Sequence, residues 1–233
     1  MNIRFVLHEL REAMRATGAD IVFLQEVLGE HQTKQKKYEE WPDGSQYEFL
    51  ADSIWSDYAY GKNAAYPEGH HGNAILSKYP ITSFKNIDVS AHPVDPRGIL
   101  HCEIRLPLDD MRLHCLCVHF GLLKTFRQHQ VSLLVDRIKQ YASEGPVIVA
   151  GDFNDWQLHA DLHLEEELQL METHKAVCGK HARTYPSFLP VFRMDRIYQK
   201  GFDIQETKIL RESIWSKLSD HLPLLSQLKI QVG

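Results

Sequence analysis

The chain has 233 residues, of which 43% are hydrophobic and 24% charged, and its formal net charge is −5. These values are typical of a globular protein with a substantial core, and we expect residues 1–233 to form a single domain. The acidic balance provides no general basic field, so strong non-specific binding to nucleic acid is not indicated. A phosphate-bearing partner must therefore be held locally, by a metal ion or by a few basic side chains.

The sequence contains no run of about eighteen apolar residues, and Glu9 and Glu12 interrupt the apolar positions near its start. We therefore predict neither a membrane span nor a signal peptide, and expect a cytoplasmic protein. The cysteines show no paired zinc spacing, which favours small core residues in a reducing compartment, above all Cys102, Cys115 and Cys117.

The first predicted element is a helix. Val6, Leu10 and Met14 form an apolar stripe at helical spacing, and Gly18 is expected to end the helix. The segment ADIVFLQEV then reads as a buried strand. The polar stretch HQTKQKKYEEWPDG that follows is typical of a solvated loop or helix face, although Lys34, Lys36 and Lys37 could also contact an anionic substrate.

Strands and helices alternate along the rest of the chain. We predict strands at Asn73–Ser77, Gly98–Leu106 and Met111–Phe120, a helix around residues 131–141, and a buried strand at VIVAG. After an acidic segment, further strands are predicted at FRMDRIYQ, FDIQETKIL and LLSQLKIQV. This order predicts a mixed α/β domain with two sheets and helices outside them.

The stretch VIVAGDFNDW places polar side chains at the end of a buried strand. Gly151 follows the apolar run, and Asp152 and Asn154 come next. Side chains two positions apart on an extended backbone point to the same face, so these two are expected to converge on one spot. An isolated GDFN could equally form an Asx turn, because Asp and Asn favour such turns.

Other strand ends carry the same kind of residue. Gln25 and Glu26 follow an apolar run, and the remaining examples are His119, Asp195, Asp220 and His221. Acids and imidazoles are costly to bury without partners, so their repeated placement beside apolar strands predicts one shared polar site. Singly, each has a simpler explanation: Glu26 as a surface acid, Asp195 as an ion-pair partner of Arg196, and Asp220 as a helix cap.

The oxygen donors of this set suit a hard cation. Carboxylate and carboxamide oxygens favour Mg²⁺ or Mn²⁺ over zinc, and the candidates are Glu26, Asp152, Asn154 and Asp220. A divalent ion would polarise phosphoryl oxygens and stabilise the charge of an in-line displacement. His119 and His221 could supply proton transfer, with Asp195 fixing the tautomer of one ring.

Seven fragments in order resemble the endonuclease/exonuclease/phosphatase superfamily, which includes DNase I-like nucleases, neutral sphingomyelinases and inositol polyphosphate phosphatases. The fragments are IVFLQEV, GNAILSKYPI, the RG of DPRGIL, VHF, VAGDFN, MDRIY and SDHLP, and they span residues 21 to 223. The chain looks most like the small bacterial metal-dependent hydrolases of this family, such as the YbhP group. The resemblance implies a four-layer α/β/β/α sandwich of two mixed sheets.

The resemblance also implies roles for individual residues. Glu26 would be the principal metal ligand, with Asp220 near the same ion or a second one, while Asp152 and Asn154 would orient the nucleophile and the scissile phosphate. His221 would be the general base or the phosphate-stabilising imidazole, oriented by Asp195, and His119 would assist the leaving group. The positions that match the lining of the phosphate pocket are Asn73 and Arg97.

The chain departs from the family at its start. Relatives begin with a strand whose Asn reaches the metal or phosphate, whereas this chain opens on the following helix, and its earliest Asn is Asn2. Either the start was cut or assigned at an internal Met, or this form lacks the strand. The domain is therefore expected to lack the usual first strand, which would open one sheet edge and remove one polar ligand.

We predict a Mg²⁺-dependent phosphoesterase that hydrolyses a phosphodiester by in-line attack of water. Nucleic acid, a phospholipid and a small molecule are all candidate substrates, and the acidic charge favours the last two over long duplex DNA. The alternatives are a non-catalytic metal- and phosphate-binding module and a truncated inactive form. Trp41 and Trp55 could serve peripheral lipid contact, stacking or the core, and His70 and His71 are predicted to be exposed.

Overall fold

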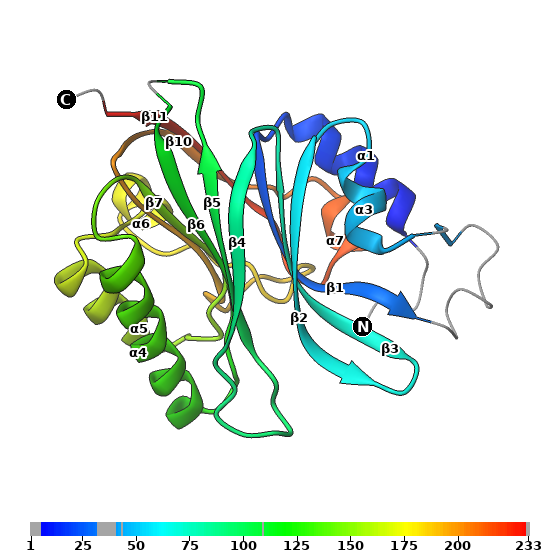
Figure 1. The fold of residues 1–233 in the computed structure, drawn as a ribbon, viewed down its shortest axis with the longest axis horizontal. Coiled ribbons are helices and arrows are strands. Elements are labelled where there is room, and N and C mark those ends of the chain that lie inside the picture. The colour runs from blue at the N-terminus through cyan, green and yellow to red at the C-terminus, as the bar shows by residue number, and fades with distance from the viewer. Residues whose placement is uncertain (1–5, 32–40, 43, 109, 232–233) are drawn as a thin grey trace.

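The largest element of the fold is a six-stranded mixed sheet in the order β4-β5-β6-β7-β9-β8 (Figure 1). The computed structural model describes residues 6–31, 41–42, 44–108 and 110–231. The strands of this sheet are β4 (Ile81–Asp88), β5 (Gly98–Arg105), β6 (Arg112–His119), β7 (Val147–Asp152), β8 (Met171–Glu172) and β9 (Asp195–Lys200). Only β6 and β7 are parallel neighbours, and the helix α4 (Lys124–Tyr141) connects them, as a parallel pair requires.

A second layer of strands consists of two smaller antiparallel sheets. One has the order β1-β3-β2, built from β1 (Ile21–His31), β2 (Asp57–Tyr66) and β3 (Gly69–Ser77), and the other pairs β10 (Phe202–Ile209) with β11 (Leu224–Ile230). Among the described residues, β1 pairs only with β3 and β11 only with β10, so each has one edge without a strand partner. Asn2, the earliest Asn of the chain, lies outside the described residues.

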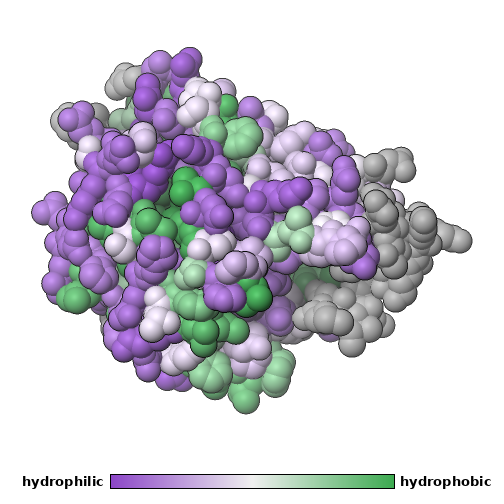
Figure 2. All heavy atoms as spheres, turned by 60° about the horizontal axis from the view of Figure 1, so that its bottom comes forward, coloured by the Kyte–Doolittle hydropathy of each residue, from purple (hydrophilic) through white to green (hydrophobic). Residues whose placement is uncertain are grey.

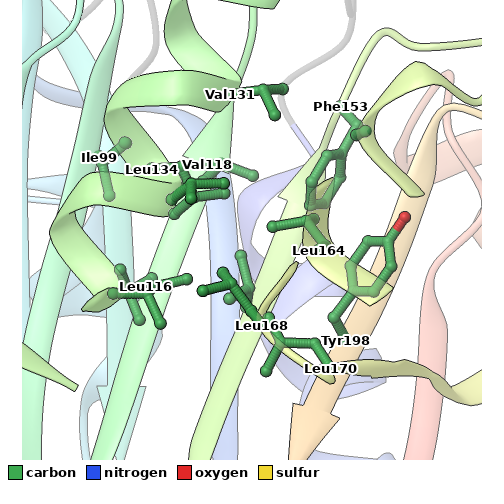
Figure 3. Packing of buried hydrophobic residues seen from close by; sticks show 14 of the residues in the cluster. Ile99, Leu116, Val118, Val131, Leu134, Phe153, Leu164, Leu168, Leu170 and Tyr198 are labelled. Carbon is green, nitrogen blue, oxygen red and sulfur yellow. The ribbon is translucent and has the colours of Figure 1, made fainter. Parts of the chain in front are cut away.

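The apolar residues form three cores, as four stacked layers require. On β6 the side chains alternate: Leu116 and Val118 face α4, whereas Cys115 and Cys117 face the smaller sheets. Figure 3 shows the first core, where residues of α4 such as Val131 and Leu134 pack against the sheet beside Phe153 and Tyr198. The second core joins the two strand layers. The third lies between the smaller sheets and the outer helices. The predicted α/β sandwich is therefore confirmed, but the expectation of two mixed sheets is not, because the second strand layer consists of two separate antiparallel sheets.

The remaining helices are short. On the side of the smaller sheets lie α1 (Leu7–Thr17), α3 (Gln46–Ala51) and α7 (Trp215–Leu218), and on the side of the large sheet lie α5 (His159–Asp161) and a π-helix (Leu162–Glu167). The helix α6 (Thr173–Cys178) contacts both β9 and β10. The predicted end of α1 is confirmed, because Gly18 has φ +69° and its N–H donates to Arg15. None of the helices among the described residues is long and apolar enough to cross a membrane.

The burial of individual residues tests several further predictions. The three strand cysteines are fully buried and pack in the core, as predicted. Trp41 and Trp55 are also buried, so both belong to the interior rather than to a membrane-contacting surface. The expectation that His70 and His71 are exposed is wrong, because both are half-buried in β3. The three lysines of the polar stretch, Lys34, Lys36 and Lys37, lie outside the described residues.

Candidate active site

Three polar side chains form one row across the large sheet. His119 ends β6, Asp152 ends β7 and Asp195 begins β9; in the register of the sheet His119 lies opposite Asp152, and Asp152 lies opposite Asp195. Residues directly opposite one another share a face of the sheet. That face is the one that packs on the smaller sheets, because Cys117, two positions before His119, belongs to the core between the strand layers.

The turn after β7 depends on a glycine. Gly151 has φ +144°, and a Cβ atom there would lie 2.0 Å from the carbonyl oxygen of Val118 on the neighbouring strand. No other residue fits such an approach without displacing β6 or β7. The glycine of the GDFN motif therefore allows the strands carrying His119 and Asp152 to lie side by side at their ends.

Asp152 and Asn154 converge as predicted, but by way of a turn. Asn154 has φ +50°, its N–H donates to Asp152 Oδ1 at 2.8 Å, and its Nδ2 lies 3.2 Å from Asp152 Oδ2. The first of these bonds is the Asx turn that the motif could form on its own. Asn154 Nδ2 also donates to the carbonyl of Phe120 at 2.9 Å, which ties the turn to the end of β6.

A hydrogen bond connects His221 to this row, and within the row His119 lies at ion-pair distance from Asp152. His221 Nδ1 lies 2.8 Å from Asp195 Oδ2, and His119 Nε2 lies 3.5 Å from Asp152 Oδ2. The ring of Tyr185 lies 4.7 Å from the His221 ring, centre to centre, and lines its other side. The predicted pairing of a histidine with Asp195 is therefore present in the fold. Asp195 does not pair with Arg196 in the described contacts.

The charges of this cluster shift its pKa values in different directions. Burial, followed by the neighbouring carboxylate of Asp195, raises the pKa of Asp152 to about 7. Burial, followed by the positive charge of Arg97, lowers the pKa of His119 to about 3. Burial opposes a charge on His221, but its hydrogen bond to Asp195 and the nearby carboxylates outweigh burial and raise its pKa to about 9. A neutral and a charged imidazole therefore flank one carboxyl group.

A buried ion network lies directly behind the row. Arg196 follows Asp195 on β9 and points to the opposite face, where its Nη1 contacts Asp155 at 3.3 Å and Asp161 at 3.4 Å. Arg127 also approaches Asp155, with its Nε 3.5 Å from Oδ1. Because Asp155 is the residue after Asn154, this network anchors the turn that carries the candidate site.

Glu26 reaches the same region from the opposite strand layer. The preceding residue, Gln25, donates its side-chain N–H to Cys117 Sγ at 3.2 Å, which sets this part of β1 against β6. Glu26 itself has φ +57° and an exposed side chain, at an irregularity in the pairing of β1 with β3. Asp220 is also exposed, and its charge contributes to the raised pKa of His221.

The two residues predicted to line a phosphate pocket lie close to the row. Asn73 is fully buried on β3 and donates through Nδ2 to the carbonyls of Gly98 and Cys117, at 3.0 and 3.2 Å. Its side-chain carbonyl oxygen is buried and has no hydrogen-bond partner among the described residues. Arg97 is half-buried and pairs with Asp95 at 2.8 Å, and its charge acts on both Asp152 and His119.

His71 is a site residue that the sequence analysis missed. Burial lowers its pKa; the charge of Glu26 raises it and that of Arg97 lowers it. His71 in turn contributes to the low pKa of His119. These mutual effects place His71 among three predicted site residues. The available signal was its position immediately before the matched fragment GNAILSKYPI, two residues from Asn73.

The donor set has some of the features that a divalent cation requires. Within residues 6–31, 41–42, 44–108 and 110–231, no three His, Cys, Asp or Glu side chains form a ready-made group of metal ligands. Two features nevertheless fit a hard cation: the carboxylates of Asp152 and Asp195 lie opposite each other, and the Asn73 carbonyl oxygen is buried without a donor. The chemistry of the donors therefore fits Mg²⁺ better than a softer metal.

Comparisons with known proteins identify the family of the chain. A model of the Endonuclease/Exonuclease/phosphatase family matches residues 1–221. The chain belongs to this family. The uncharacterized protein YbhP of Escherichia coli K12 is 46% identical over 229 residues, which cover 98% of this chain and 90% of that protein. The resemblance inferred from seven short fragments is therefore confirmed.

Solved structures of this family share the fold. A mannosyl-6-phosphatase from Bacteroides thetaiotaomicron superposes with a TM-score of 0.73 at 16% identity, covering 96% of this chain and 90% of that one. The catalytic domain of human Nocturnin, solved with a bound sulfate anion, gives a TM-score of 0.76 at 17% identity, covering 97% of this chain and 86% of that one. At 16% and 17% identity, these similarities show that the chain shares its fold with both proteins.

Proposed function

We propose that this family member is a divalent-metal-dependent phosphoesterase that hydrolyses a phosphodiester. The observation that carries the proposal is the row of His119, Asp152 and Asp195, extended by His221 through a 2.8 Å contact. The names of its structural neighbours support phosphate chemistry: one is a phosphatase, and another was solved with sulfate, an anion of the same tetrahedral shape.

The reaction adds water to phosphorus. The water oxygen forms a bond to phosphorus, the bond from phosphorus to one alcohol oxygen breaks, and the alcohol leaves with a proton while the product is a phosphomonoester. Asp152 is positioned to accept the proton of the water, and its raised pKa near 7 suits a base that works near neutral pH. Asn154 contacts the carboxyl group of Asp152 through its backbone N–H and its side-chain amide, and so holds that group in place.

The two imidazoles take different roles in this proposal. His221, oriented and charged through Asp195, stabilises the negative charge that develops on the phosphoryl oxygens, which is the second of the two roles expected for it. His119, neutral and 3.5 Å from Asp152, lies where it can hydrogen-bond the departing oxygen. Asn73 and Arg97 line the pocket for the phosphate.

Glu26 is the proposed principal ligand of Mg²⁺ or Mn²⁺, and Asp220 is proposed to lie near the ion. The ion, when bound, polarises the phosphoryl oxygens and neutralises charge that the acidic side chains alone could not tolerate. The buried carbonyl oxygen of Asn73, which has no partner within the described residues, is a further candidate oxygen ligand.

The test is hydrolysis of bis-p-nitrophenyl phosphate by the purified protein with Mg²⁺, with EDTA, and with Mg²⁺ restored. We expect turnover that EDTA abolishes and that falls by about 10²-fold or more in Asp152→Asn and His221→Ala. Asp136→Asn, on the exposed face of α4, is the matched control and should be unaffected. If calorimetry detects binding of Mg²⁺ and inorganic phosphate but no product forms, the binding-module alternative replaces the enzyme.

A further inference from the structure

Half of the large apolar side chains that the described surface leaves exposed belong to four connecting segments. Phe188 and Val94 are the most exposed, at 81% and 83%. Figure 2 turns the lower end of Figure 1 forward and shows apolar side chains gathered there between polar areas. We call the following eight residues the apolar rim: Val94, Leu122, Leu123, Trp156, Phe188, Leu189, Val191 and Phe192.

One segment of the rim is attached directly to the candidate site. Residues 185–192 carry four rim residues, and this segment begins at Tyr185, whose ring packs on His221. The Ser187 N–H donates to the carbonyl of Asp220 at 2.7 Å, and the Ser187 hydroxyl donates to that of Ser219 at 2.7 Å. The exposed Phe188 and Leu189 therefore follow immediately after a residue bound to the site loop.

The other three segments lie beside one another at the same end of the large sheet. Arg127 donates to the carbonyl of Leu122 at 2.8 Å, and its guanidinium carbon lies 5.1 Å from the centre of the Trp156 ring. The segment with Val94 adjoins the start of this group, since a Cβ on Gly121 would lie 2.5 Å from Asp95 Oδ2. The rim therefore borders the region where β6 and β7 deliver His119 and Asp152.

Backbone hydrogen bonds fix the conformation of the rim segment before β9. In the segment before β9, the N–H groups of Val191 and Phe192 both donate to the carbonyl of Tyr185, at 2.9 and 2.8 Å, and Leu189 N–H donates to Pro186 at 3.0 Å. These bonds close a loop whose tip points its apolar side chains outward. Large apolar patches of this kind mark surfaces that meet a partner or a membrane.

Cations accompany the rim in an otherwise acidic chain. Residues 179–194 contain Lys180, Arg183 and Arg193 and no acidic residue. Residues 119–135 also lack acidic residues and contribute the exposed Lys124, whereas Arg127 in that segment is buried and paired with Asp155. The whole chain, in contrast, has a net charge of −5. The acids that follow β7 are engaged internally, as the ion pairs of Arg196 with Asp155 and Asp161 illustrate.

The cations beside the rim favour some partner surfaces over others. A second copy of the chain, rim against rim, would bring the same cationic segments together, and like charges oppose such a contact. An anionic bilayer attracts the cations and accepts the apolar tips at the boundary between headgroups and acyl chains, where a Trp side chain is also favoured.

We propose that the apolar rim inserts into the interface of an anionic phospholipid bilayer and presents the headgroup phosphodiester of a membrane lipid to the site. The inference rests on the proposed phosphodiesterase function and names its substrate class. Lipid phosphates lie at the level of the headgroups, just outside the apolar tips, and the row of His119, Asp152 and Asp195 is set back from the rim at the strand ends.

The test is co-sedimentation of the purified protein with vesicles of phosphatidylcholine, with and without phosphatidylglycerol. Wild type should bind the anionic vesicles, and Phe188→Ser/Leu189→Ser and, separately, Leu122→Ser/Leu123→Ser should bind about tenfold more weakly or worse. The matched control is Phe84→Ser, because Phe84 is an exposed aromatic residue in the middle of β4, away from the rim. Hydrolysis of soluble bis-p-nitrophenyl phosphate should be unchanged in all three variants.

The outcomes separate this inference from the proposed function. Turnover of the soluble substrate without vesicle binding, or equal binding by wild type and both rim variants, overturns membrane docking and leaves the phosphodiesterase intact. Vesicle binding that requires the rim, without turnover of any phosphodiester, removes the enzymatic function instead. A dimer in sedimentation equilibrium that is lost in the rim variants would assign the surface to a second copy and overturn the proposal.

Discussion

Asp195 Oδ2 and His221 Nδ1 lie 2.8 Å apart, although 26 residues separate them in the sequence. The contact joins the start of β9 to the loop before β11, so it fixes the orientation of an imidazole that no strand carries. Because Asp195 also lies opposite Asp152 in the sheet, one carboxylate positions His221 relative to the proposed base.

Replacing Asp195 by Asn should lower kcat/KM for a phosphodiester by about 10²-fold or more, since the ring of His221 loses the carboxylate whose negative charge stabilises its protonated form. The fold should persist, because the amide keeps the shape of the side chain. Steady-state kinetics with saturating Mg²⁺, together with a thermal melt, measure both effects. Asp136→Asn serves as the control; a variant Asp195→Asn as active as wild type would remove Asp195 from the site.

Gly151→Ala should destabilise the protein by about 2–5 kcal/mol, because the new Cβ would collide with the backbone of Val118. Gly179→Ala is a matched control, since Gly179 also has positive φ (+70°) but nothing within 4 Å of the added atom. Its cost should be only about 1–2 kcal/mol of backbone strain. Urea unfolding curves of the two variants give the difference, and equal losses would show that the close approach of β6 is not what requires glycine.

Removing the buried cation behind the site should be more damaging than removing an exposed one. Arg196→Met leaves the carboxylates of Asp155 and Asp161 buried beside an apolar side chain, and we expect a loss of about 3–5 kcal/mol in the free energy of unfolding. Lys208→Met, which breaks the exposed pair with Glu206, should cost less than about 1 kcal/mol. Denaturant titration distinguishes the two, and a neutral Arg196→Met would mean that those acids are satisfied by other groups.

A buried histidine pair outside the site should make the fold sensitive to acid. Arg137 donates to His101 Nδ1 at 2.9 Å, so His101 is neutral with its proton on Nε2, which donates to His114 Nδ1 at 2.9 Å. Burial, followed by the charges of Arg137 and His114, lowers the pKa of His101 from 6.5 to about 3.

The sign of the effect follows from proton binding. Between pH 6.5 and about 3 the unfolded chain binds a proton at His101 that the folded chain does not, so this contribution to stability is complete above pH 6.5 and is lost as the pH falls through that window. His101→Gln keeps one acceptor and one donor without titrating, and should reduce the slope of stability against pH by an amount on the order of 3 kcal/mol across the window. His129→Gln, at an exposed position, should leave the slope unchanged. Identical slopes for wild type and His101→Gln would contradict the assignment.

Elements with strong local signals could be predicted from the sequence. The apolar stripe ending at Gly18 and the apolar run of β7 each carry their own pattern, and so do β5 and β6. In contrast, β2 and β4 were not predicted, because β2 is rich in small and polar residues and β4 has largely exposed side chains that show no apolar alternation. These strands are determined by their pairing with β3 and β5, which is a long-range property.

The candidate site also combines residues that local motifs predict with contacts that only the fold creates. The strand ends of the large sheet bring His119, Asp152 and Asp195 together, and Asn154 and His221 lie in short motifs on the adjoining loops. The pairing of Arg196 with Asp155 and Asp161 joins residues 41 and 35 positions apart, so adjacency in sequence wrongly suggested Asp195 as its partner. The nearness of His71 to this group depends on how the two strand layers pack, which no local pattern reports.

The row of His119, Asp152 and Asp195 exists only when β9 is paired with β7 in a single alignment. A shift by one residue would bring Arg196 into line with Asp152 and turn Asp195 towards the helices, since neighbouring side chains on a strand face opposite ways. The long excursion of residues 153–194 must therefore return to one position before any chemistry is possible. Under the proposed function, an emerging or partly assembled chain would be inert towards phosphodiesters, and turnover would serve as a direct readout of correct strand alignment.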